Sequence, residues 1–340
     1  MPNDSLYRKI LGASPYIEIL VRHIYWKNVK TFKQAVNLLS KLRKKEITTP
    51  LPATKVVPLE TVMNYLKAFG IKEGDTMVVH SSYDALKVTR KLPRDINHEL
   101  LSIVGTSGNL VMPVNRTYSK TDSLRLYETV SDIDVLDVNK TKVSTGALGF
   151  MLMRHPEAVK SRYPINSIVA VGALSKEMTQ KNLEGDKPTP CGTNSAWKYC
   201  HDLNAYIIGL GIDLTHSLTM THVVEDAWEN EWNIEGWYDE RTFKIIDTDF
   251  EQTVTIRERR PKWGKLFFAE RKLCKDLLAV GIMTSVNIEG ITIEIIKSHD
   301  LVQFLKSKNK TGYPFYCVGK KKSLKNNVKE NASTTRFKAL

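Results

Sequence analysis

Hydrophobic and polar positions alternate along the middle of the chain with two different periods. Apolar residues three or four positions apart predict helices, and short apolar runs bounded by turn-forming residues predict strands. The helical segments are residues 59–69, 97–104, 146–154 and 219–228. The strand-like segments are residues 76–80, 109–113, 167–172 and 205–211. This alternation predicts an α/β fold in which helices cover a central sheet.

The pattern changes after Trp237, where strand-like segments follow one another along the chain. These segments are residues 242–246, 252–256 and 291–296. The change predicts that the central sheet is mixed. The expected architecture is therefore a three-layer α/β/α domain with a mixed central sheet and a helical extension at the N-terminus.

Residues 15–45 form that extension and show a roughly helical period in which Lys and Arg separate the apolar positions. Tyr16, Tyr25 and Trp26 lie beside basic residues, as in helices that lie at a membrane surface. The same pattern suits a helix packed on the main domain or on a second subunit. Both interpretations stay open, and the second includes a homodimer.

A proline-rich stretch ends the helical pattern and divides the chain. Residues 1–50 are predicted to be a basic amphipathic extension with its linker. Residues 51–318 are predicted to form the α/β domain. Residues 319–340 have no periodicity, which predicts a basic disordered tail.

The net charge of +13 belongs to the two ends of the chain. Residues 1–48 hold ten Lys or Arg against three acids, and residues 318–340 hold seven against one. The rest of the chain is balanced, with 33 basic and 33 acidic residues. Basic ends suit an anionic membrane, whereas a neutral core argues against nucleic acid as a partner.

The composition predicts a globular protein in a reducing compartment. Apolar residues make up 42% of the chain, which is enough for a sizeable core. The four cysteines lack zinc-like spacing, and the N-terminus lacks the features of a signal peptide. Glu18, Arg22 and His23 interrupt the most hydrophobic N-terminal part, so no membrane-spanning helix is expected. We therefore expect a cytoplasmic protein, with peripheral contact at the inner face of the membrane as an option.

Two segments place polar residues at the carboxyl ends of predicted strands, where α/β sheets collect ligands. In the first, an apolar strand ends in His80, Ser81 and Ser82. Hydroxyl and backbone N–H groups there could hold a phosphate or an amide. The alternative is structural, because serines after a strand often cap a helix.

In the second segment a glycine-bearing strand ends at Asp213, and Ser217 could cap the helix that follows. That helix would carry Thr219, His222 and Glu225 on one face. An imidazole beside a carboxylate can take a proton from an attacking amine while the carboxylate stabilises the imidazolium. On spacing alone, however, such a pair is more often a surface ion pair.

Other chemistries have weaker support in the sequence. His201, His216 and His222 lie close together, but the chain has no HExxH motif and the last two point to different helix faces. We therefore expect no metal. The chain also lacks GxSxG, P-loop and GxGxxG motifs, which argues against an α/β hydrolase, a nucleoside triphosphatase and a dinucleotide oxidoreductase.

Four segments, in order, resemble the aminoglycoside 3-N-acetyltransferase family, which is distinct from acetyltransferases built on the GNAT fold. They are FGIKEGDTMVVHSSYDAL (69–86), GTSGNLVMPV (105–114), STGALGFMLMRHPEAVKSRYPINSIVAVG (144–172) and YIIGLGIDLTHSLTMTH with Glu225 (206–225). Four ordered matches are far more specific than any one of them.

The resemblance implies acetyl coenzyme A as donor and direct transfer to an amine of an amino sugar or aminocyclitol. It makes His222 the general base, Glu225 its carboxylate partner or a contact of the substrate amine, and Thr219 a hydrogen-bond partner on the donor side. The residues expected to bind the coenzyme are His80, Ser81, Ser82, Ser144, Thr145 and Gly146. Asn166 and Asp213 are expected on the acceptor side.

The chain departs from the family pattern where the acceptor is expected. The family usually has two histidines just before Ser167, and this chain has neither; Asn166 stands there. Phe150 replaces a family acid. Aminoglycosides are polycations whose binders need an acidic cleft. A neutral core with basic ends suits a neutral or phosphate-bearing amino sugar better, for example a nucleotide- or lipid-linked sugar of surface-polysaccharide synthesis.

Three other functions stay open. Sugar O-acetylation is close to the first, because a histidine base can deprotonate a hydroxyl as well as an amine. A non-catalytic member could keep the fold and bind a membrane or a partner through its basic ends. A metal-dependent hydrolase could use His222 and Glu225.

Overall fold

The computed structural model describes most of the α/β domain and the first part of the N-terminal extension. The described residues are 10–29, 31–32, 34, 56–118, 133–232, 234–309 and 316–317. The predicted linker around residue 50 and the predicted basic tail over residues 319–340 lie outside them. The same holds for the part of the predicted N-terminal helix beyond residue 34.

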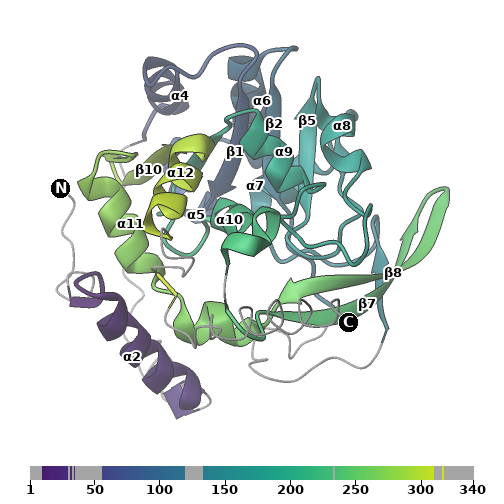
Figure 1. Cartoon of the computed structure of the whole chain (residues 1–340). Coiled ribbons are helices and arrows are strands. Elements are labelled where there is room, and N and C mark those ends of the chain that lie inside the picture. The colour runs from purple at the N-terminus through teal and green to yellow at the C-terminus, as the bar shows by residue number, and fades with distance from the viewer. Residues whose placement is uncertain are drawn as a thin grey trace, which may run out of the picture.

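A seven-stranded mixed sheet forms the centre of the fold (Figure 1). Its strands are β1 (Thr76–Ser81), β2 (Asn109–Pro113), β4 (Val159–Lys160), β5 (Ile168–Gly172), β6 (Tyr206–Leu210), β9 (Met283–Ile288) and β10 (Ile291–Lys297). They lie in the order β4-β5-β2-β1-β6-β10-β9. β2, β1 and β6 are parallel, and every other pair of neighbours is antiparallel. The predicted mixed sheet is confirmed.

Helices cover both faces of this sheet, because successive side chains of a strand point to opposite sides. Met77 and Val79 of β1 belong to one hydrophobic core and Val78 to the other. The first core is closed by α4 (Leu59–Ala68), α6 (Pro93–Val104) and α7 (Ala147–Leu152). The second is closed by α8 (Ser175–Gln180), α9 (Ala196–Asp202), α10 (His222–Ala227), α11 (Glu270–Ala279) and α12 (Ser298–Lys308). The predicted three layers are confirmed.

Short helical turns connect these elements near the carboxyl ends of the strands. They are α5 (Tyr83–Leu86), η1 (Lys87–Thr89), η3 (Thr219–Thr221), η4 (Glu229–Glu231) and the π-helix η5 (Trp263–Phe267). In the sequence the stretch over 219–228 predicted one continuous helix. Instead, a 3₁₀ turn precedes α10, so the α-helix begins at His222.

A separate three-stranded sheet lies beside the main domain (Figure 1). It consists of β3 (Asp134–Asp137), β7 (Tyr238–Asp247) and β8 (Phe250–Arg259), in that order. The predicted strands over 242–246 and 252–256 therefore belong to this sheet and not to the central one. Phe243, Ile245 and Ile256 form a small core of their own with Leu136 and Tyr163, which gives these strands a place to bury their apolar faces.

The N-terminal helix α2 (Pro15–Lys27) docks on the domain through polar side chains. Glu18 is fully buried, and its carboxylate accepts hydrogen bonds from the backbone N–H groups of Arg271 and Lys272 at 3.2 and 3.1 Å. These groups belong to the first turn of α11, where backbone N–H groups lack partners within the helix and an acidic side chain is favourable. Of the two interpretations of this helix, packing on the domain is therefore observed.

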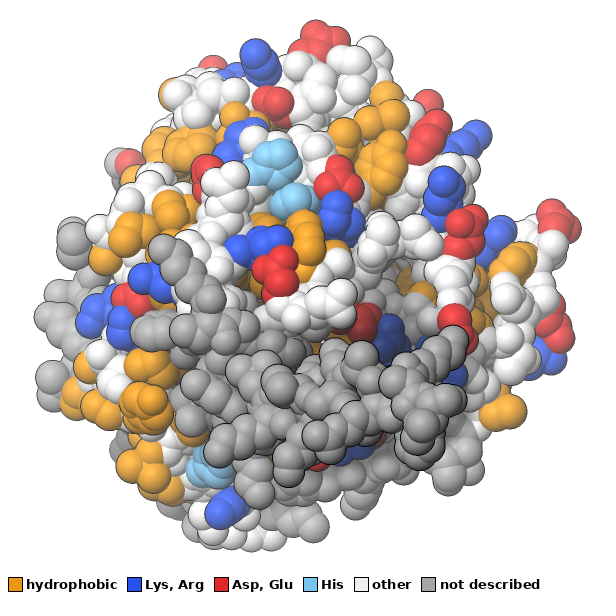
Figure 2. Space-filling view, in the orientation of Figure 1, with side chains coloured by type: hydrophobic (Ala, Val, Ile, Leu, Met, Phe, Trp, Pro, Cys, Tyr) orange, Lys and Arg blue, Asp and Glu red, His pale blue; other side chains and the backbone are white. Residues whose placement is uncertain are grey.

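The opposite face of α2 presents apolar side chains to solvent. Tyr16, Leu20 and Ile24 are 72%, 61% and 51% exposed. Figure 2 shows hydrophobic side chains gathered along this helix at the lower left of the molecule. Within the described ranges, every helix is too short or too polar to cross a membrane.

Candidate active site

The three parallel strands end at the same edge of the central sheet, and a cavity of about 170 Å³ opens there. We call it the strand-end cavity. Its walls come from the ends of β1 and β2, the start of α7 and the segment after β6. The lining residues are Val79, His80, Ser81, Met112, Pro113, Asn115, Thr145, Gly146, Gly149, Ile212, His216, Ser217 and Thr219.

The strand-end cavity is polar, and the described residues that line it include no carboxylate, lysine or arginine. His80 Nε2 and Thr145 Oγ1 are buried in it, and neither makes a hydrogen bond with the described residues. Burial lowers the pKa of His80 to about 4, so the imidazole is neutral near pH 7. Two unused polar atoms in an uncharged wall are suited to a ligand with neutral carbonyl or amide groups.

Helix α7 packs directly on the strand ends because its N-cap residue, Gly146, and one residue within it, Gly149, are glycines. A Cβ atom at Gly146 would lie 3.3 Å from the carbonyl oxygen of Ser81, and one at Gly149 would lie 3.2 Å from that of Pro113. Both distances are tighter than ordinary carbon–oxygen contacts. Glycine at these positions therefore keeps the Thr145–Gly146 turn close to β1.

Four of the six residues predicted to bind a coenzyme line this cavity: His80, Ser81, Thr145 and Gly146. Ser82 and Ser144 lie next to them in sequence but do not line it. Ser82 is the residue before α5 and makes no side-chain cap, whereas the Ser144 hydroxyl donates to the carbonyl oxygen of Asn115 at 3.4 Å.

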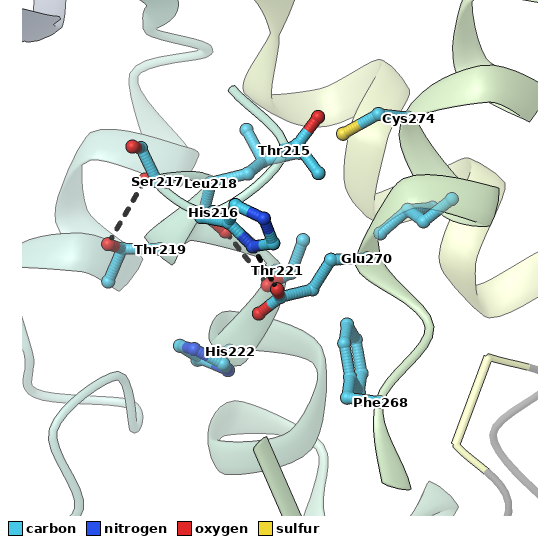
Figure 3. Close-up of a pocket in the computed structure, with 11 residues that line it drawn as sticks. Thr215, His216, Ser217, Leu218, Thr219, Thr221, His222, Phe268, Glu270 and Cys274 are labelled. Carbon is cyan, nitrogen blue, oxygen red and sulfur yellow. Dashed lines mark hydrogen bonds and ion pairs between the residues drawn. The ribbon is translucent and has the colours of Figure 1, made fainter. Parts of the chain in front are cut away.

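A second cavity, of about 50 Å³, adjoins the first and shares His216, Ser217 and Thr219 with it. We call it the histidine cavity. Its lining residues are Thr215, His216, Ser217, Leu218, Thr219, Thr221, His222, Phe268, Glu270, Leu273 and Cys274. Figure 3 shows Glu270 reaching towards His216, with the rings of His222 and Phe268 below it in that view.

The predicted pair of His222 and Glu225 is present at this cavity. His222 Nδ1 contacts Glu225 Oε1, and the Glu225 side chain is only 2% exposed. On the other side of the ring, Arg259 Nη2 lies 3.2 Å from His222 Nε2. Because a guanidinium can only donate, Nε2 accepts this bond, which places the proton of the neutral imidazole on Nδ1. The imidazole is therefore held between a buried carboxylate and a guanidinium.

The carboxylate that follows Glu225 has a different role. Burial, and then the neighbouring Glu225, raise the pKa of Asp226. Asp226 accepts hydrogen bonds from the backbone N–H of Cys191 at 2.9 Å and from the Tyr238 hydroxyl at 3.0 Å. It thus favours its neutral form and holds the protein chain around the site.

Glu270 connects the histidine cavity to the N-terminal helix. Its Oε2 atom lies 2.7 Å from His216 Nδ1 and 2.6 Å from Arg22 Nη2. Burial opposes ionisation of this carboxyl, but His216 and Arg22 together lower its pKa to about 2. Arg22 of α2 therefore completes the ion-pair network in the wall of the cavity.

Asn166 and Asp213, predicted on the acceptor side, line neither cavity. The carbonyl oxygen of Asn166 accepts a hydrogen bond from the Trp197 indole at 2.7 Å. An Asp213 carboxylate oxygen accepts one from the backbone N–H of Thr215 at 3.1 Å. In this structure both residues support the chain around the cavities.

Several residues of the histidine cavity carried no signal in the sequence. Glu270, Phe268 and Arg259 lie in segments without a motif and reach the site only through the fold. In the sequence, His216 stands out only as a possible metal ligand. The one feature that could have indicated its place at the cavity is its position in the same loop as Thr219.

Of the three histidines considered for a metal site, His216 and His222 line the same cavity and do not lie on one helix, contrary to the expectation that they point to different faces of a helix. His201 is in α9, where its ring contacts His299, and His216 pairs with Glu270. All four cysteines are buried free thiols. In the part of the chain that the structure describes, no three metal-ligating side chains are grouped to hold an ion.

Comparison with known proteins gives consistent matches. The family model "Aminoglycoside 3-N-acetyltransferase" matches residues 78–308. Aminoglycoside N(3)-acetyltransferase IX of Micromonospora chalcea is 25% identical over 238 residues, which are 64% of this chain and 80% of that protein. Aminoglycoside N(3)-acetyltransferase VII of Streptomyces paromomycinus is 24% identical over 260 residues, which are 70% of this chain and 86% of that protein.

Solved structures with the same fold also match. AAC-VIa bound to sisomicin superposes with a TM-score of 0.60 at 17% identity, covering 75% of this chain and 96% of that chain. The binary complex of AAC-IIIb with CoASH superposes with a TM-score of 0.58 at 18% identity, covering 73% and 94%. At these identities the likeness concerns the fold.

Proposed function

Because this chain belongs to the aminoglycoside 3-N-acetyltransferase family, and is thus an acyltransferase, we propose that it acetylates the amine of an amino sugar or aminocyclitol from acetyl coenzyme A. The observation that carries the proposal is the His222–Glu225 pair. It lies at a cavity that joins the strand-end cavity through His216, Ser217 and Thr219. Donor and acceptor could therefore meet beside one base.

The strand-end cavity is the proposed donor site. Acetyl coenzyme A supplies the thioester carbonyl that the amine attacks. His80 Nε2 and Thr145 Oγ1 support the fit, because both are buried polar atoms that the described residues leave without a partner. The CoASH complex of AAC-IIIb, which shares the fold, agrees with a coenzyme as donor.

His222 is proposed to take a proton from the acceptor amine. Its Nδ1 atom is held by Glu225, so Nε2 is the nitrogen that can receive the proton. The amine nitrogen forms a bond to the acetyl carbonyl carbon, and the carbon–sulfur bond of the thioester breaks. The proton on Nε2 then passes to the sulfur, so the products are the N-acetylated acceptor and the free thiol. Glu225 stabilises the imidazolium that forms between the two steps.

The acceptor class has two candidates. Both relatives described above are named aminoglycoside N(3)-acetyltransferases, which supports an aminoglycoside. The charge division and the replacement of a family acid by Phe150 support a neutral or phosphate-bearing amino sugar, including a nucleotide- or lipid-linked one. O-acetylation uses the same base, and a sugar without an amine distinguishes it.

The full chain can be tested by following release of the coenzyme thiol with a panel of acceptors: amino-sugar phosphates, amino-sugar nucleotides, free amino sugars, aminoglycosides and the matching sugars without an amine. We expect transfer to amines, with the acetamide confirmed by mass spectrometry. Turnover of hydroxyl acceptors alone would replace the proposal with O-acetylation. Coenzyme binding without transfer to any acceptor would favour a non-catalytic member.

We also propose that α2 contacts an anionic lipid surface, with its polar face on the domain and its apolar face outward. Tyr16, Leu20 and Ile24 form the exposed face, and residues 1–48 carry seven more basic than acidic residues. An apolar stripe with aromatic residues and a surplus of cations is typical of helices at bilayer surfaces. A homodimer through the same face stays a separate prediction.

Sedimentation with lipid vesicles tests this contact. The full chain should pellet with vesicles that contain phosphatidylglycerol and less with pure phosphatidylcholine. The double substitution Leu20→Glu and Ile24→Glu should abolish pelleting, whereas Leu92→Glu, at an equally exposed leucine outside α2, should not. Equal pelleting of both variants would refute the contact, and a loss of dimer in the first variant without lipid binding would identify a second copy as the occupant.

A further inference from the structure

Arg259, at the end of β8, contacts Nε2 of His222, the nitrogen that would receive the proton in the proposed transfer. Its Nη2 atom lies 3.2 Å from His222 Nε2, and its Nη1 atom lies 3.7 Å from Glu225 Oε1. Nη1 is buried and makes no hydrogen bond with the described residues. The guanidinium therefore covers Nε2 of His222, and its Nη1 group could still donate a hydrogen bond to a ligand.

The π-helix η5 makes the space for this side chain. A Cβ atom at Gly264 would lie 2.9 Å from Arg259 Nη2 and 3.2 Å from Cζ. The carbonyl oxygen of Gly264 accepts a hydrogen bond from Arg22 Nη1 at 3.1 Å, which holds the turn in place from the α2 side. The position of the Arg259 side chain is therefore fixed by the surrounding residues. Phe268 of the histidine cavity also contributes, with its ring centre 6.0 Å from Cζ of Arg259.

A proton cannot reach Nε2 while Nε2 accepts a bond from Arg259. The acceptor amine must displace the guanidinium of Arg259, which would then lose its hydrogen bond to His222 while remaining partly buried. Loss of a partner for a buried charged donor is costly, so displacement is favoured when the acceptor itself brings an acceptor group for the guanidinium. Phosphate matches the planar fork of arginine with two parallel hydrogen bonds.

The carboxylates around the site do not favour a polycation. The Oε1 atom of Glu225 is engaged by both His222 and Arg259, and its Oε2 atom, which makes no hydrogen bond with the described residues, is buried away from solvent. Glu270 is engaged by His216 and Arg22. Among the described residues that line the histidine cavity, Glu270 is the only carboxylate. An acceptor with several ammonium groups would thus meet a guanidinium and find no unpaired acid in the described lining.

We propose that Arg259 is an anion subsite that takes a phosphate close to the acceptor amine and, by doing so, uncovers Nε2 of His222. This inference rests on the proposed acetyl transfer and specifies its acceptor as a phosphorylated amino sugar. Arg259 is then a specificity-determining residue, because the same contact that recruits the phosphate frees the base.

The test compares acetyl transfer to glucosamine 1-phosphate and to glucosamine. The wild-type chain should prefer the phosphate by roughly 10-fold or more in kcat/KM, the scale of one charge-assisted contact. The variant Arg259→Gln should lose most of this preference. Its transfer to glucosamine should be equal to or higher than that of the wild-type chain, because Nε2 of His222 is no longer covered. Arg257→Gln, two residues away on the same strand and paired with Glu229, is the matched control and should keep the preference.

The two acceptors also separate a selective role from a structural one. An equal fall of transfer to both acceptors in Arg259→Gln would overturn the proposal, as would a wild-type chain without phosphate preference. If no amine is acetylated at all, the proposed function fails, and calorimetric binding of the same two sugars decides the subsite alone. Phosphate-selective binding that Arg259→Gln abolishes would sustain it, and equal binding of both sugars would reject it.

Discussion

The two cavities differ in how they are built. The strand-end cavity is formed largely at the ends of β1, β2 and β6, and among the residues that the structure describes its lining has no carboxylate, lysine or arginine. The histidine cavity and its surroundings draw on α2, α10, β8 and α11, and their polar groups are linked as ion pairs. The first site is formed by neighbouring strands of one sheet and the segments that follow them. The second depends on how separate helices and the smaller sheet pack against one another. Changes to each should therefore have separable effects.

The largest expected effect is on the histidine cavity. His222→Ala should lower acetyl transfer by about 100-fold or more, the usual scale for a lost general base. Coenzyme binding, which belongs to the strand-end cavity, should stay intact when measured by titration calorimetry. His98→Ala removes an exposed histidine of α6 and serves as control. Unchanged turnover in folded His222→Ala would remove this residue from the mechanism.

A substitution in the sheet should act on the fold of the strand-end cavity instead. A Cβ atom at Gly209 of β6 would lie 2.5 Å from the carbonyl oxygen of Ile212, a backbone atom that cannot move freely. Gly209→Ala should lower the free energy of unfolding by about 3 kcal/mol, as overpacking of a core does. Urea denaturation measures the loss. Gly281→Ala, with open space around it and only a positive φ to strain, should cost less.

The link between α2 and the histidine cavity should be weaker. Arg22→Ala removes a cation from Glu270 and should cost about 1 to 3 kcal/mol of unfolding free energy, the range for a lost bond to a charged group. It should change acceptor kinetics more than coenzyme binding. Lys27→Ala, at an exposed position in the last turn of the same helix, should leave both unchanged. An identical response of the two variants would show that α2 does not support the cavity.

The pH dependence of the unfolding free energy also distinguishes the two cavities. The folded-state pKa of His80 is lowered to about 4, so the stability from its neutral form is present above pH 6.5 and is lost as pH falls towards 4. The slope for one proton is at most about 1.4 kcal/mol per pH unit. Glu270, with a pKa lowered to about 2, contributes above pH 4.5 and loses its contribution below it. His80→Gln should reduce the pH dependence of the unfolding free energy between pH 6.5 and 4, and a slope equal to that of the wild-type chain in this window would contradict the assignment.

Much of the fold could be read from the sequence because its signals are local. The predicted strand over 109–113 coincides with β2, and the predicted strand over 205–211 contains β6. Both are short apolar runs that are buried on both faces of the sheet. The two strands over 242–246 and 252–256 were recognised, but their place in a separate sheet was not, since periodicity says nothing about which partner a strand pairs with.

The site divides in the same way. His80, Ser81, His222 and Glu225 follow strands that the sequence predicted, and the spacing of the last two was enough to bring them together once a helix formed. Whether they formed a cavity, and not a surface ion pair, depended on the packing around them. Of the residues predicted on the acceptor side, Asn166 lines neither cavity, and its side-chain amide lies beside the buried thiol of Cys191.

The sequence by itself determined the α/β class, the donor-side motif, the HxxE pair and the confinement of excess charge to the ends, since each is a property of neighbouring residues. Only the tertiary structure decided the surroundings of the base. Arg22 and Glu270 are 248 positions apart, and Arg259 lies 37 positions from His222. Contacts at such separations arise from how helices and sheets pack. The charges that surround His222, and with them the proposed choice of acceptor, became visible only in the folded chain.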